Sequence, residues 1–148
     1  MAYSQLNINN QICFRLYTAS RLVVQCYRPF LDKLGLTYLQ YIVMLVLWEK
    51  DEVFVGDISK KLMLDTNTIT PLLQRMEKEG FITRKKSIKD TRQRIISLTP
   101  KGKALEEETK DIPECIANYV LKNNLNIEEL QTFVPVLDNI IGALKNQK

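Results

Sequence analysis

Histidine is absent from the 148 residues of this chain, so a hydrolase built on a Ser–His or Cys–His pair is not expected. The three cysteines include no C-x-x-C pair, and without histidine they make a poor zinc site. Nor does their number indicate a structural disulfide framework in a chain that is not exported. We therefore expect no metal, no cofactor and no enzyme activity.

Long apolar runs are also missing. The best candidate, "YIVMLVLW" (Tyr41–Trp48), is far shorter than the roughly 20 residues that span a bilayer. The segment "MAYSQLNINN" has neither a basic region nor an apolar region of the kind found in export signals. We expect a cytoplasmic protein with no membrane partner, folded as a single domain over residues 1–148.

Charge is unevenly distributed along the chain. Residues 104–148 contain four Lys and eight Asp or Glu, a net charge of −4, which leaves +8 for the first 103 residues. A basic body favours a polyanion partner, although a merely solvated charged face is the alternative.

Hydrophobic periodicity predicts four helices, a β-hairpin and two further helices. We expect Asn9 or Asn10 to cap the first helix, Thr37 the second and Thr99 the fifth. Pro113 is expected to kink the fifth helix, and Pro135 lies inside the sixth. The predicted helices cover about 10–34, 38–50, 55–64, 67–79, 100–122 and 127–146, and the strands lie in "FITRKKS" and "RIISLTP".

The order of short helix, polar turn, second helix and basic hairpin is typical of a winged helix-turn-helix, here about 38–99. The fold class is therefore mainly α with a small β-hairpin wing. Small polar side chains at the start of the second helix can approach base edges and phosphates, and Arg75 follows on the same helix. The helix-start residues are Thr66, Asn67, Thr68 and Thr70.

The hairpin is strongly basic, with Asp90 as its one acid against six Lys or Arg. An arginine at a loop tip is suited to a narrow minor groove, so we expect the hairpin to contact DNA. A solvated hairpin that only confers solubility is the alternative. The six basic residues are Arg84, Lys85, Lys86, Lys89, Arg92 and Arg94.

In the first helix, Cys13, Tyr17 and Tyr27 share one face at about 100° per residue, whereas Cys26 points about 140° away from Cys13. Fourteen helical residues span roughly 21 Å, so Tyr27 meets Cys13 only across a dimer. A cysteine in the first turn is favoured as a thiolate, which two phenol donors would strengthen. The alternative for each cysteine is a small packing residue.

The segments "LDTNTITPLLQRMEKEGFITR" and "DTRQRIISLTPKGKAL" resemble the MarR family of winged-helix regulators. The resemblance implies that Arg92 enters the minor groove and that Asp90 holds it in place. It also implies a homodimer assembled from the first and last helices, about 8–34 and 100–146, on a pseudo-palindromic double-stranded operator.

The motif N-Q-x-C-F, here Asn10 to Phe14, resembles the OhrR subfamily, which senses organic hydroperoxides. The resemblance implies that Cys13 is redox-active and that Tyr17 and Tyr27 of the partner bind its sulfur. The position of Cys115 is similar to that of the resolving thiol in two-cysteine, AbfR-like regulators, although a bystander is the alternative.

These patterns together predict a redox-controlled transcription regulator, expected to be a repressor, which an organic hydroperoxide or a related oxidant releases from DNA. Two other functions stay open. One is a MarR regulator that binds a phenolic or drug-like ligand, and the other is a thiol peroxidase.

Overall fold

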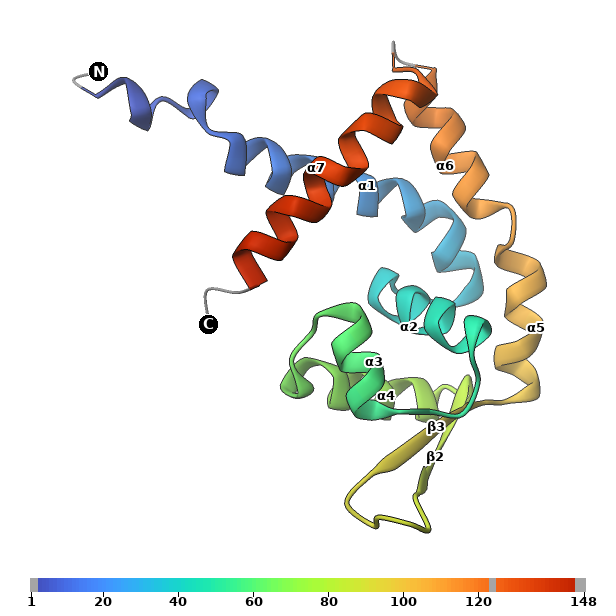
Figure 1. Cartoon of the computed structure of the whole chain (residues 1–148). Coiled ribbons are helices and arrows are strands. Elements are labelled where there is room, and N and C mark those ends of the chain that lie inside the picture. The colour runs from blue at the N-terminus through green and yellow to red at the C-terminus, as the bar shows by residue number, and fades with distance from the viewer. Residues whose placement is uncertain (1–2, 123–124, 146–148) are drawn as a thin grey trace. The chain divides into compact units, whose positions relative to one another are not determined.

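The computed structural model describes residues 3–122 and 125–145 of the chain. They fold as two compact units, Met1–Lys110 and Asp111–Lys148. Among the described residues, the first unit holds five α-helices, three short 3₁₀ turns and a small sheet, and the second holds two α-helices (Figure 1).

Helix α1, Ile12–Leu31, follows two short 3₁₀ turns, Ser4–Leu6 and Ile8–Asn10. Its N-cap is Gln11, so the predicted cap at Asn9 or Asn10 is wrong. The Asn10 amide instead donates to the Ser4 carbonyl (2.9 Å), and the Gln11 side chain donates to the Gln5 carbonyl. The amides of the N-Q-x-C-F motif therefore hold the preceding turns against the start of the helix.

Helix α2, Tyr38–Glu49, begins as predicted at Thr37. The Thr37 hydroxyl accepts from the Gln40 amide, while the Gln40 side chain accepts from the Thr37 amide (2.8 Å). Before it, a 3₁₀ turn at Asp32–Leu34 ends at Gly35, which has a φ of +68°. The side chains of Val43, Met44 and Leu47 are fully buried, so α2 is the central helix of the first unit.

Helices α3, Val55–Leu62, and α4, Thr66–Lys78, are joined by a short polar turn. Apolar spacing of 3.6 residues gives α4 one buried face, as the sequence predicts. That face consists of Ile69, Leu72, Leu73 and Met76. The opposite face of α4 is left in solvent.

The predicted hairpin is confirmed as strands β2, Ile82–Lys86, and β3, Arg94–Leu98. It extends away from the helices of the first unit (Figure 1). The structure adds a two-residue strand, β1, Val53–Phe54, which pairs with β3 in the sheet order β1-β3-β2. The Asp51 carboxylate positions it, accepting from the backbone amides of Glu52 (2.8 Å) and Leu98 (2.9 Å).

Helix α5, Pro100–Thr109, is capped by Thr99 as predicted, and the Thr99 hydroxyl accepts from the Gly102 amide (3.0 Å). The predicted kinked continuation to Lys122 is wrong, because α5 ends and a separate helix α6, Ile112–Leu121, begins. Pro113 lies in the first turn of α6, where a proline starts a helix more readily than it continues one.

Helix α7, Ile127–Lys145, contains Pro135 as predicted. Its predicted end at Asn146 lies outside the described residues. Among the described helices, none is by itself long and apolar enough to cross a membrane. Only the bent pair Ile12–Leu34 and Tyr38–Glu49 meets that requirement when both are taken together, and its second member is the core helix α2.

Candidate functional site

The exposed face of α4 carries the predicted base-contacting residues. Thr66, Asn67 and Thr68 lie in its first turn and are exposed, and Thr70 is half-buried. Arg75 is exposed two turns further on. The buried face of α4 fixes the direction in which these side chains point, so the helix presents a polar edge without disturbing the core.

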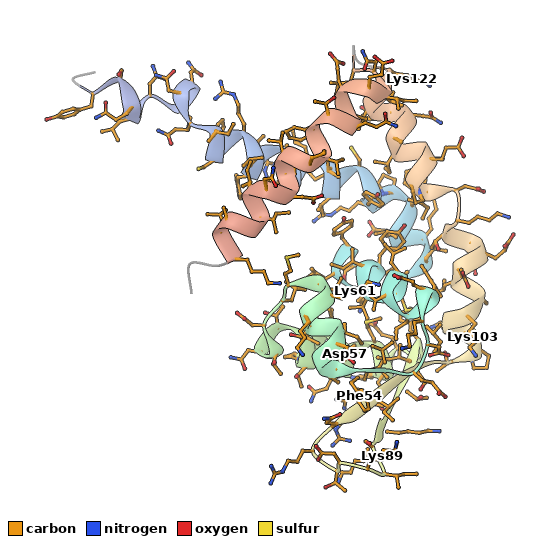
Figure 2. All side chains as sticks on the ribbon, viewed as in Figure 1. Phe54, Asp57, Lys61, Lys89, Lys103 and Lys122 are labelled. Atoms are coloured by element: carbon orange, nitrogen blue, oxygen red, sulfur yellow. The ribbon has the colours of Figure 1, made fainter. Side chains whose placement is uncertain are left out.

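The tip of the hairpin is an ordered turn. Ser87 is buried, and its hydroxyl accepts from the amides of Lys89 (3.3 Å) and Asp90 (3.4 Å). The Asp90 carboxylate accepts from the Arg92 amide (3.0 Å), so it holds the backbone of Arg92. Figure 2 shows Lys89 at the far end of this hairpin. The exposed basic residues of the wing are Lys85, Lys86, Lys89, Arg92 and Arg94.

Arg84 is placed differently from the other basic residues of the wing. Its Nε donates to Oε2 of Glu77 (2.9 Å), and its backbone amide donates to Oε1 of the same carboxylate (3.1 Å). The Arg84 side chain is largely buried in this contact. Arg84 therefore joins strand β2 to the recognition helix α4.

A cleft of about 630 Å³ lies between α3, α4 and the wing. It brings together residues from both predicted DNA-contacting elements, including Thr66, Thr70, Arg92 and Arg94. Lys60 of α3 also lines this cleft, and sequence reasoning missed it. In the sequence, the one sign that Lys60 belongs to this surface is its position shortly before the polar turn that precedes α4. The surface that results is positively charged, which suits a phosphate backbone.

Cys13 lies in the first turn of α1, two residues after the N-cap Gln11, and is exposed. Tyr17, one turn further on, is 65% exposed. Tyr27 is half-buried, fourteen positions from Cys13 along the same helix, so the two do not meet within one chain. Cys26 is half-buried beside it, a placement that fits a packing residue.

Tyr27 belongs to an aromatic cluster with two tyrosines of α2 that sequence reasoning did not single out. Its ring centroid lies 5.1 Å from that of Tyr38 and 5.6 Å from that of Tyr41. Burial, with a smaller contribution from Tyr38, raises the pKa of Tyr27 above its usual value of 10.0. A phenol hydroxyl is protonated at neutral pH in any case, so Tyr27 is available as a hydrogen-bond donor.

Cys115 lies in α6, in the second unit, and is exposed. All three cysteines are free thiols. In the part of the chain that the structure describes, no group of three or more Cys, Asp or Glu side chains is arranged to hold a metal ion.

A polar recognition helix beside an ordered basic wing defines a winged-helix DNA-binding regulator. Residues 25–109 match the family described as transcriptional regulator SarA/Rot. The chain belongs to this MarR-like family of winged-helix transcription regulators. The predicted resemblance and fold class are confirmed, and the relatives are regulators rather than enzymes.

Individual relatives agree with this assignment. The chain is 41% identical over 130 residues to the organic hydroperoxide resistance transcriptional regulator of Bacillus subtilis, covering 88% of each protein. A crystal structure of overoxidized AbfR bound to DNA is 34% identical, with a TM-score of 0.78 and coverage of 97% of this chain and 99% of that one. AbfR is a protein of Staphylococcus epidermidis. Its disulfide-formed structure is also 34% identical, with a TM-score of 0.65 and coverage of 93% and 94%.

Proposed function

We propose that this protein is a homodimeric, redox-sensing repressor that binds a pseudo-palindromic operator when reduced and releases it when Cys13 is oxidised by an organic hydroperoxide. The observation that carries the proposal is the exposed Cys13 in the first turn of α1, on one face with Tyr17 and Tyr27. The similarity to a regulator named for organic hydroperoxide resistance supports it.

We assign the DNA contacts to two elements, helix α4 and the wing. Side chains at the start of α4 contact bases and phosphates in the major groove, and Arg92 of the wing enters the minor groove. The residues at the start of α4 are Thr66, Asn67, Thr68 and Thr70. We assign Lys85, Lys86, Arg94 and Arg75 to phosphates. Arg84 supports the wing through Glu77 rather than reading DNA directly.

The dimer is supported by apolar side chains left in solvent. On α1 these include Ile12, Phe14, Leu22 and Val23, and on α7 they include Phe133, Val134, Val136 and Ile141. Several large apolar side chains exposed on the same helix favour a protein partner. A second copy would supply that cover, present a second recognition helix to the other half-site, and bring Tyr27 of one chain to Cys13 of the other.

The sensing step is a two-electron oxidation of sulfur. The Cys13 thiolate attacks the terminal, hydrogen-bearing oxygen of the hydroperoxide, so an S–O bond forms and the O–O bond breaks. The departing alkoxide takes up a proton and leaves as an alcohol, and Cys13 becomes a sulfenic acid. The phenols of Tyr17 and Tyr27 would stabilise the thiolate before this step and lose that contact after it.

We assign Cys115 of the partner subunit as the resolving thiol. Its thiolate attacks the sulfenic sulfur, an S–S bond forms, the S–O bond breaks, and the departing hydroxide takes up a proton to leave as water. The exposure of both thiols and the similarity to a disulfide-formed AbfR support this assignment. The disulfide would pull the first and sixth helices of opposite subunits together and change the separation of the two recognition helices.

An operator-shift assay with cumene hydroperoxide tests the sensor. Cys13→Ser is expected to bind the operator and ignore the oxidant, whereas Cys26→Ser, the matched control in the same helix, responds as the wild type does. Loss of DNA binding by Cys13→Ser at the oxidant concentrations that release the wild type overturns the proposal.

A non-reducing gel tests the resolving thiol separately. Oxidised wild-type protein is expected to give a covalent dimer that both Cys115→Ser and Cys13→Ser abolish and Cys26→Ser retains. A band that persists in Cys115→Ser removes that residue from the scheme and leaves the role of Cys13 intact.

A ligand-responsive regulator is the second candidate, favoured by one observation. A cavity of about 770 Å³ has an apolar wall that includes Leu31, Leu36 and Leu72. Two basic residues, Arg28 and Arg75, and two acidic residues, Asp32 and Glu79, also line it. Such a lining suits a small aromatic ligand that carries polar groups. Release of the operator by benzoate from Cys13→Ser protein would establish this alternative.

A further inference from the structure

We propose that Trp48 is the positioning residue that couples the state of the Cys13 site to the position of the wing. Trp48 lies in the last turn of α2, with its ring centroid 6.3 Å from that of Tyr41. Its indole Nε1 donates a hydrogen bond to the Gly102 carbonyl in the first turn of α5 (3.0 Å). The inference rests on the proposed function and names how one site controls the other.

The sensing end of α2 carries Tyr38 and Tyr41, which both contact Tyr27. These rings form a continuous set of contacts from α1 to α2, because Tyr38 and Tyr41 also lie 6.3 Å apart. Twelve helical residues cover roughly 18 Å, and the buried side chains of Val43, Met44 and Leu47 fix one face of α2 in the core. A displacement of Tyr27 therefore moves α2 as a rigid body.

The other end of α2 and the turn that follows it hold the junction between β3 and α5, residues Leu98–Gly102, at two points. One is the Trp48 hydrogen bond to Gly102, and the other is the Asp51 carboxylate, which accepts from the Leu98 amide (2.9 Å). Both bonds connect the end of α2 to the segment where the wing strand turns into α5. The position of α2 consequently sets the position of this junction.

The junction is packed too closely to absorb such a shift locally. A Cβ atom on Gly102 would lie 2.2 Å from the Phe81 carbonyl oxygen, so the two backbones are already in contact. The Thr99 hydroxyl lies 2.6 Å from the Gly80 carbonyl oxygen, and the Thr99 amide donates to the Phe81 carbonyl (3.1 Å). A movement of Gly102 is passed directly to the segment that leads from α4 into β2.

The coupling follows from these contacts. In the reduced dimer, the sulfur of the partner's Cys13 holds the Tyr27 hydroxyl, and the Tyr27–Tyr38–Tyr41 cluster holds α2. Oxidation removes that hydrogen bond, α2 shifts, and Trp48 transfers the shift to Gly102 and hence to the wing. The DNA-reading elements then no longer match the operator.

The test replaces Trp48 by Phe, which retains an aromatic ring and removes the N–H donor. Reduced Trp48→Phe is expected to bind the operator within about threefold of the wild type, with Cys13 oxidised at the same rate by mass spectrometry. Oxidation is expected to lower the operator affinity of Trp48→Phe by a factor about ten times smaller than in the wild type. A factor of ten corresponds to about one hydrogen bond. Lys103→Gln, which removes a looser contact to Asp51 (3.6 Å) at the same junction, is the control with an unchanged response.

Tryptophan fluorescence provides a second test that needs no variant at this position, because Trp48 is the one tryptophan of the chain. Its fluorescence emission is expected to change when wild-type protein is oxidised and to stay constant in oxidant-treated Cys13→Ser. An unchanged emission on oxidation, or full release of the operator by oxidised Trp48→Phe, overturns the coupling. If wild-type protein keeps its operator after Cys13 is oxidised, the sensor proposal fails instead.

Discussion

One carboxylate, that of Glu77, accepts hydrogen bonds from both the backbone amide and the guanidinium of Arg84 (3.1 and 2.9 Å). This contact attaches the first strand of the wing to the recognition helix within the same unit. Arg84 and Arg92, which look equivalent in the basic hairpin sequence, therefore have different positions and different expected roles.

Replacing Glu77 by Gln is expected to weaken operator binding without changing its dependence on salt, because the wing loses support but no phosphate contact. The variant is also expected to lower the free energy of unfolding by about 1 kcal/mol, since the pair is partly exposed. Operator titrations at several salt concentrations and urea unfolding measure the two effects. A changed salt dependence would mean that Arg84 contacts DNA.

Arg92→Ala is expected to weaken binding and to reduce the slope of log K against log salt by about one, because one cationic contact is lost. Stability in urea is expected to stay within about 0.5 kcal/mol of the wild type, since Arg92 is exposed. Lys33→Ala, a surface charge removed outside the wing and α4, controls for net charge. An equal slope in Arg92→Ala and wild type would contradict the minor-groove assignment.

Gly102→Ala is expected to lower the free energy of unfolding by about 3 kcal/mol, because the added Cβ meets a backbone carbonyl rather than a flexible side chain. Gly56 provides the matched control, since a Cβ there meets nothing within 4 Å. Gly56→Ala is expected to leave stability unchanged or to raise it by up to about 1 kcal/mol. Urea unfolding of both variants decides the matter, and equal midpoints would contradict the close approach.

Burial raises the pKa of Tyr41 from 10.0 to about 12, with smaller contributions from Tyr27 and Tyr38. The folded state holds this proton more tightly than the unfolded state, so the stabilisation is complete below pH 10 and is lost as pH rises toward 12. The loss amounts to about 1.4 kcal/mol for each pH unit in that range.

Tyr41→Phe is therefore expected to unfold with a flatter pH dependence between pH 10 and 12. Urea unfolding at a series of alkaline pH values measures it. Tyr3→Phe, at an exposed position, is the control and keeps the wild-type slope. A wild-type slope in Tyr41→Phe would contradict the buried placement of the phenol.

Local features of the fold were predictable wherever one residue type has one structural use. Thr37 and Thr99 cap helices where a hydroxyl precedes an apolar period, and Gly35 and Gly80 adopt the positive φ that ends a helix. Strand β1 was not predictable, because two residues carry no periodicity and their pairing depends on the distant Asp51–Leu98 hydrogen bond. The break between α5 and α6 was predicted as a kink, because a proline such as Pro113 is equally compatible with a kink in one helix and with the start of a second helix.

The candidate site likewise has features that the sequence predicts and features that depend on the folded structure. The shared face of Cys13, Tyr17 and Tyr27 follows from helical geometry alone. The clustering of Tyr38 and Tyr41 around Tyr27 does not, because it depends on how α1 packs on α2. The role of Arg84 was equally hidden, since the sequence gives its charge and not its proximity to Glu77.

The separation of α4 into a buried and an exposed face has a consequence for how such a regulator diversifies. Ile69, Leu72, Leu73 and Met76 anchor the helix, while Thr66, Asn67 and Thr68 lie in solvent. If these exposed positions contact bases as proposed, substitutions there would change the target sequence at little cost in folding. A lineage of such proteins would then be free to acquire new target genes while keeping the same chemical stimulus.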